Sequence, residues 1–142
     1  MSFDLERFVT AQRPVYAQVC KELEAASKTS HWMWFVFPQL RALGRSPTAK
    51  FFGLQGLDEV AAYWAHPVLG ERLRHCTQLV LGVRQRSIHQ VFGTPDDLKL
   101  CSCMTLFEAA APHEPSFGLL LAQDFGGTRD KATLALLASP CC

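Results

Sequence analysis

Apolar residues recur along most of the chain at intervals of three and four positions, the spacing of one face of an α-helix. The stretch 68–81 shows this most clearly, because its apolar residues share one face and its charged and polar residues share the other. A second apolar stripe runs over residues 15–26, just after a proline placed as in a helical first turn. No segment alternates as a half-buried strand does. The pattern therefore predicts an all-α protein.

Capping signals divide the chain into short helices. Asp4 and Asp58 each precede an apolar stretch as N-cap residues do, and Ser87 with Gln90 has the spacing of a capping box. These signals predict helices over residues 5–9, 15–26, 47–52, 58–64, 68–81, 88–93, 95–110, 117–125 and from 131 onward. Short helices with proline starts do not build a regular four-helix bundle. We therefore predict an irregular multihelical single domain over residues 1–142, with its core at about 3–138 and a short flexible C-terminal tail.

An aromatic run interrupts the amphipathic pattern. Residues 31–37 are apolar on every face and end at Pro38, which pushes the preceding residue toward extended geometry. Periodicity does not distinguish a strand from a helix in so short a run. Because the run is brief and has helical flanks, we expect a short helix buried in the middle of the domain.

Composition narrows the class of protein. The chain has 142 residues and a formal net charge of +1, with Lys and Arg scattered among Asp and Glu, so nothing indicates a nucleic-acid partner. The first residues lack the basic start and apolar stretch that are typical of a signal peptide, and no apolar run approaches the roughly 20 residues of a membrane span. We expect a soluble cytoplasmic protein with no membrane association.

Cysteine and histidine spacing does not indicate a metal site or a cofactor. The six cysteines show no paired spacing of the disulfide or zinc type. Cys101 and Cys103 would point about 200° apart on a helix, which is poor geometry for one metal ion. The histidines follow no metal-ligand pattern either. We therefore expect neither a metal nor a cofactor.

Three motifs resemble a widespread bacterial family of unknown function. They are SHWMWFVFPQL at residues 30–40, HPVLG at 66–70 and DDLKL at 96–100. The resemblance implies a multihelical fold with an unusual short buried central helix, and no established activity. Relatives are sometimes labelled calpastatin, which is a disordered inhibitor, whereas this sequence has the core of a folded domain. The family usually has Arg and Ser where Cys101 and Cys103 stand here, which puts in question any site relying on that arginine.

The aromatic run is the first candidate site. Trp32 and Trp34 offer flat faces for a planar ligand, with His31 and Gln39 as polar groups at the two ends. Alternatively the rings fill the core, with their indole N–H groups bonded to backbone carbonyls and His31 capping the segment. Continuous apolar runs are usually core, which favours the second interpretation.

The second candidate is a polar strip on the helix predicted at 95–110. Helical spacing places Asp96, Lys99, Ser102 and Cys103 along one side of a helix that is otherwise apolar. A buried ammonium near carboxylates binds phosphate or serves in acid–base chemistry. Alternatively Asp96 and Asp97 cap the helix while Lys99 makes a structural ion pair. The sequence leaves both interpretations open.

Three hypotheses of function follow. The first is binding of a small planar or phosphorylated, nucleotide-like ligand between the aromatic run and residues 96–102. The second is an enzyme acting on ADP-ribose or NAD-type substrates, because the helical layout is similar to the NADAR glycosidase superfamily, although that family's Gly-Lys-Asn signature is absent here. The third is a protein-interaction module with exposed aromatics as anchors. The sequence assigns neither catalytic residues nor an oligomeric state.

Overall fold

Helices make up the architecture of residues 3–138, the part of the chain that the computed structural model describes. In chain order these are α1 (Glu6–Gln12), α2 (Tyr16–Glu24), α3 (Met33–Val36), the 3₁₀ turn η1 (Arg41–Leu43), α4 (Pro47–Phe51), α5 (Leu57–Ala65), α6 (Leu69–Leu81), α7 (Ile88–Phe92), α8 (Asp96–Ala110), α9 (Pro115–Asp124) and α10 (Lys131–Ala138). The all-α, multihelical prediction is confirmed. The predicted tail falls mostly within residues 139–142, outside the described range.

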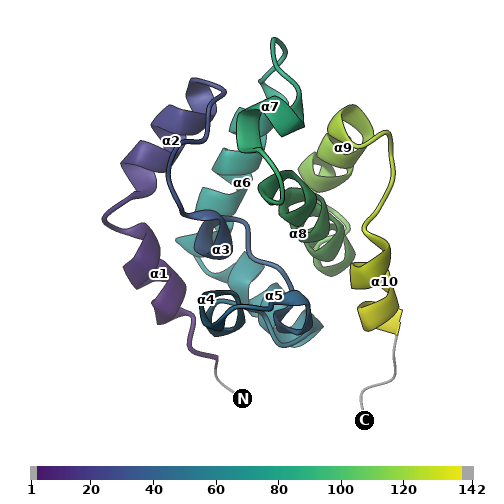
Figure 1. Cartoon of the computed structure of the whole chain (residues 1–142). Helices are drawn as coiled ribbons and strands as arrows, with labels where there is room; N and C mark the ends of the chain where they lie inside the picture. The colour runs from purple at the N-terminus through teal and green to yellow at the C-terminus, as the bar shows by residue number, and fades with distance from the viewer. Residues whose placement is uncertain (1–2, 139–142) are drawn as a thin grey trace.

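Helix α8 is the central element of the fold. Six consecutive residues in its second half, 102–107, are buried. The helix packs against α5, α7, α9 and α10, and Figure 1 shows it between α6 and α9. A helix that is apolar nearly all round is buried on all sides, which explains this position.

Several helix starts follow the predicted capping chemistry. The Ser46 side chain accepts a hydrogen bond from the amide of Ala49, and Ser87 forms the predicted capping box with Gln90. The predicted N-cap at Asp58 is wrong, because α5 begins at Leu57. Asp58 instead lies in the first turn, where a negative charge still interacts favourably with the helix dipole.

The first helix also starts later than its capping signal predicts. Leu5 is the N-cap of α1 and Asp4 makes no capping hydrogen bond. The Asp4 backbone carbonyl instead accepts a hydrogen bond from the Arg7 guanidinium. The start of α1 therefore has no side-chain N-cap, and its contact with Asp4 comes instead from Arg7, a residue of the helix itself.

The aromatic run contains a single helical turn. In α3 and its flanks, Trp32, Met33, Val36 and Phe37 are buried, as the expectation of a short buried central helix requires. After the turn the chain extends and pairs with residue 54 in one isolated parallel bridge, with Arg41 N donating to Leu54 O at 2.8 Å. This bridge holds the segment that follows α3 against the start of α5.

Glycine is required where that bridge forms. A Cβ atom at Gly53 would lie 2.4 Å from the Arg41 Cα, closer than non-bonded atoms approach. The two backbones can therefore come together only because residue 53 has no side chain.

No helix within residues 3–138 has the length and apolar character needed to cross a membrane.

Candidate functional site

A small hollow opens beside the aromatic run. Side chains from α3, the loop after it, the α4 region and α8 surround the hollow, whose water-accessible volume is about 10 Å³; they are Met33, Trp34, Phe37, Gln39, Ala49, Phe52 and Lys99. The Lys99 ammonium lies over the Trp34 ring, 5.7 Å from the ring centroid. The hollow thus combines an apolar floor, an aromatic face, one amide and one cation.

The two tryptophans of the run have different surroundings. Trp32 is 1% exposed, and its ring packs against Phe37 and Phe92. Its indole Nε1 donates to Glu22 Oε1 at 2.9 Å, so the expected backbone carbonyl partner is wrong for this ring. Trp34 is only half-buried and lines the hollow. The core interpretation therefore describes Trp32, and the open-face interpretation describes Trp34.

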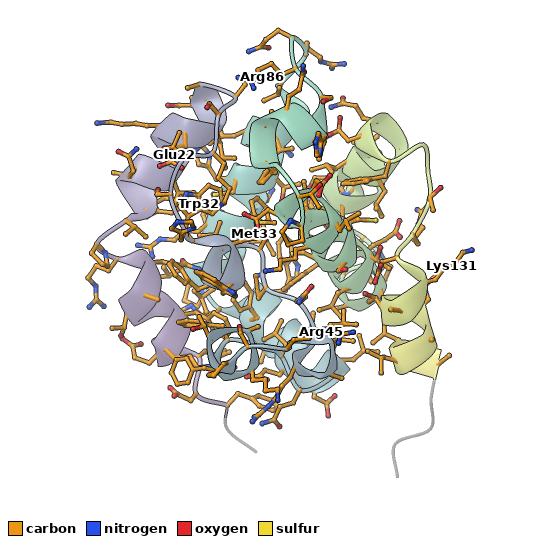
Figure 2. All side chains as sticks on the ribbon, in the orientation of Figure 1. Glu22, Trp32, Met33, Arg45, Arg86 and Lys131 are labelled. Carbon is orange, nitrogen blue, oxygen red and sulfur yellow. The ribbon has the colours of Figure 1, made fainter. Side chains whose placement is uncertain are left out.

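A buried carboxylate holds the start of the aromatic run. Glu22 Oε1 accepts hydrogen bonds from the Thr29 and Ser30 amides at 2.8 and 3.1 Å, in addition to the Trp32 indole. Its Oε2 accepts from Ser30 Oγ at 2.5 Å and Gln18 Nε2 at 3.0 Å. Burial alone would raise the pKa of Glu22, but these hydrogen bonds outweigh it and lower the pKa well below its usual range. Figure 2 shows Glu22 on α2 beside Trp32.

A second polar network holds the far end of the same turn. Gln12 Nε2 donates to the Phe35 carbonyl at 2.6 Å and to the Tyr63 hydroxyl at 3.1 Å. Arg72 Nη1 in turn donates to Gln12 Oε1 at 3.3 Å. With Glu22 at one end and Gln12 at the other, α3 is fixed between α1, α2 and α5. The backbone that carries Trp34 is thereby held at both ends of the turn.

Asp96 and Lys99 are not partners. Asp96 pairs with Lys28, with 2.8 Å between Oδ2 and Nζ, and Lys28 also donates to the Ser30 carbonyl at 2.7 Å. Within residues 3–138 Lys99 has no carboxylate partner, so its predicted structural ion pair is wrong. The two side chains separate because Asp96 lies at the α8 start, next to the α2–α3 connection, whereas Lys99 lies one turn later beside the hollow.

The remaining candidates do not line the hollow. His31 is exposed, and the residue that precedes α3 as its N-cap is Trp32, without a side-chain cap, so His31 does not cap the segment. Ser102 is buried and its Oγ donates to the Leu98 carbonyl at 3.2 Å. Burial raises the pKa of the Cys103 thiol well above its usual value, which opposes thiolate chemistry.

The structure thus brings together three of the seven candidate residues at one hollow: Trp34, Gln39 and Lys99. Sequence reasoning missed Glu22, although a signal for it exists. Glu22 stands three positions after Val19 and four before Ala26, on the apolar stripe of its helix. An acid on a buried stripe needs hydrogen-bond donors, which Thr29 and Ser30 supply.

The described residues contain no group of three His, Cys, Asp or Glu side chains arranged to hold a metal ion.

Comparisons with known proteins place the chain among proteins of unknown function. The family model described as "Protein of unknown function (DUF1810)" matches residues 2–137. The crystal structure of the conserved hypothetical protein Rv1873 from Mycobacterium tuberculosis is similar, with 56% sequence identity and a TM-score of 0.95, over 97% of this chain and 99% of that one. A search of curated proteins gave no match. The chain therefore belongs to the DUF1810 family of proteins of unknown function.

Proposed function

We propose that the protein binds a small planar ligand at the Trp34 hollow and holds a polar or anionic group of that ligand with Lys99. The observation that carries the proposal is the convergence of the Trp34 ring, the Gln39 side chain and the Lys99 ammonium on one hollow with an apolar floor. Binding sites for small molecules combine apolar walls with a few convergent polar groups in this way.

Each of the three residues supplies a different kind of contact. The Trp34 indole offers a flat face on which a ring stacks. The Gln39 amide both donates and accepts hydrogen bonds, which suits the edge of a heterocycle. Lys99 supplies a compact positive charge on a flexible four-carbon stem. Together these contacts favour a heterocycle that carries an anionic substituent.

The ligand enters by displacing Lys99 from the indole. With a volume of about 10 Å³, the hollow has room for roughly one water molecule while the lysine covers Trp34. An ammonium–indole contact near the surface stabilises the covered form by only about 0.5–1 kcal/mol. An anionic ligand recovers this cost because the displaced ammonium then pairs with it. The aromatic wall need not move, since α3 is held at both ends.

A thermal-shift screen of the purified protein tests the proposal. The panel comprises nucleobases, nucleosides, nucleotides, NAD and ADP-ribose, measured with the native protein and with Trp34→Ala, Lys99→Ala and Lys131→Ala. Lys131 is exposed and distant from the hollow lining, so Lys131→Ala is the matched control (Figure 2). A ligand at 100 times its Kd stabilises the native protein by about 2.7 kcal/mol.

We expect at least one compound to raise the melting temperature of the native protein and of Lys131→Ala, and to have no effect on Trp34→Ala or Lys99→Ala. Each variant is first compared with the native protein without ligand, so that a loss of folding is recognised directly. A panel without any stabilising compound, or a shift that persists in both hollow variants, would contradict the proposal.

A further inference from the structure

The segment that supplies most of the hollow's lining has an excess of positive charge. Residues 25–57 contain no Asp or Glu, whereas they contain Lys28, Arg41, Arg45 and Lys50. The whole chain has a net charge of +1, so the rest of the sequence carries a net charge of −3. The description of Lys and Arg as scattered among Asp and Glu therefore does not hold for this segment, which also contributes most of the hollow's lining.

Within residues 3–138, three of these four cations have no acidic partner. Lys28 is neutralised by Asp96. Arg41, Arg45 and Lys50 are exposed and make no ion pair with a carboxylate in the described part of the chain. We call residues 41–50, which carry these three side chains, the basic segment.

The basic segment adjoins the hollow, although its three cations are not among the residues that line it. Gln39 lies two residues before its first cation, Ala49 lies within it, and Phe52 follows its last cation by two residues; all three line the hollow. Lys99 lines the same hollow from α8. Unneutralised charges of one sign along a concave site raise the local concentration of ions of the opposite sign.

From this arrangement we infer that the ligand is polyanionic: a heterocycle with a diphosphate chain, its ring against Trp34 and its phosphates between Lys99 and the basic segment. The inference rests on the proposed function and adds the charge of the ligand to it. Lys99 alone would neutralise a single negative charge, whereas Arg41, Arg45 and Lys50 on the adjoining segment would balance further ones. Arginine, present twice in the segment, donates two parallel hydrogen bonds to phosphate oxygens.

Calorimetric titration of matched pairs tests the inference. The probes are adenosine, guanosine, cytidine and uridine, each beside its 5′-diphosphate, at low and at physiological salt. The proteins are the native chain, Arg45→Glu, Lys50→Glu and the control Arg86→Glu. Arg86 is also exposed but lies beyond α6 at the end of the molecule remote from Arg45, as Figure 2 shows.

We expect at least one diphosphate to bind the native protein at least tenfold more tightly than its nucleoside. Arg45→Glu and Lys50→Glu each reduce that preference by roughly threefold to tenfold, and Arg86→Glu leaves it unchanged. The preference also shrinks as salt rises, because exposed charges are screened over about 8 Å at physiological ionic strength.

The two proposals fail in different ways. If a nucleoside and its diphosphate bind equally well, or if Arg45→Glu and Arg86→Glu have the same effect, the polyanion inference is wrong while binding at Trp34 stands. If none of the eight probes binds the native protein, the polyanion inference falls, and the screen of the wider panel decides the proposed function by itself.

Discussion

At the scale of single residues, Glu22 is the most consequential polar group of the fold. Transfer of a carboxylate from water into a protein interior costs several kcal/mol unless donors replace the lost hydration. Here two backbone amides, a hydroxyl, a side-chain amide and an indole replace it. Four of these contacts come from residues 29–32 and join α2 to the start of the aromatic run, while the fifth, from Gln18, lies within α2.

We predict that Glu22→Gln lowers the free energy of unfolding at pH 7 by about 3 kcal/mol. Glutamine keeps one acceptor oxygen but turns an NH₂ group toward donors that the second carboxylate oxygen accepted from. Urea unfolding measures the loss, with the exposed Glu24→Gln on the same helix as the matched control. An equal effect of both variants would show that the buried hydrogen bonds contribute nothing.

The acid dependence of stability provides a second prediction for Glu22. Its pKa is lower in the folded protein than in the unfolded chain, so the unfolded state takes up a proton first as the pH falls. The contribution of Glu22 is complete above the usual glutamate pKa of about 4.3 and is lost progressively below it. Unfolding curves between pH 7 and 3 should therefore fall more steeply for the native protein than for Glu22→Gln. Parallel curves would refute the depressed pKa.

At the scale of elements, α5 and α6 meet at a point where only glycine fits. A Cβ atom at Gly70, in the first turn of α6, would lie 2.1 Å from the backbone carbonyl oxygen of Trp64 in α5. The obstacle is backbone rather than a flexible side chain, so one of the two helices would have to shift. Local helix propensity, which favours alanine over glycine, is here overridden by packing.

We therefore expect Gly70→Ala to destabilise the protein by roughly 2 kcal/mol, a typical cost of overpacking. Gly82, at the other end of the same helix, is the matched control, because its φ of −75° suits alanine and its Cβ would meet the nearest atom at 3.5 Å. Gly82→Ala should be neutral or stabilising by up to about 1 kcal/mol. Thermal unfolding of both variants measures the difference, and a harmless Gly70→Ala would disprove the close contact.

The helices could be predicted from the sequence more fully than the contacts at the hollow. The periodicity of 68–81 and the Ser87–Gln90 capping box each predict a helix found in the structure, because both depend on residues only three or four positions apart. The meeting of Trp34 with Lys99 depends instead on how α3 packs against α8, across 65 positions of sequence. The partner of Asp96 was missed for the same reason, since Lys28 lies on a different element.

At the scale of the whole molecule, one continuous core joins residues from every part of the described chain, and two thiols lie inside it. Cys76 and Cys103 are fully buried. Burial raises the pKa of Cys76 to about 12, helped by the neighbouring Cys20, so its thiol stays protonated at neutral pH. Reaction at these two positions consequently requires the core to open.

Alkylation with iodoacetamide, followed by peptide mapping, should leave Cys76 and Cys103 unmodified in the native protein at pH 7 after Cys101, which is half-buried, has reacted. Their modification rates should rise with urea in parallel with global unfolding. At pH 9, Cys76 in the native protein should still be alkylated more slowly than Cys101. Early modification of Cys103 without urea would show that α8 is not enclosed as described.

The helix α3 is only one turn long, and this length limits how the segment could be used in another protein. So short a helix has no stability of its own in water, because nucleation costs more than one turn returns. Its geometry comes from Glu22 on one side and from Gln12 and Tyr63 on the other, all of which lie outside the motif itself. Residues 30–40 transplanted into an unrelated scaffold would therefore keep their sequence but lose the helical turn, because the groups that hold it would remain in the rest of the chain.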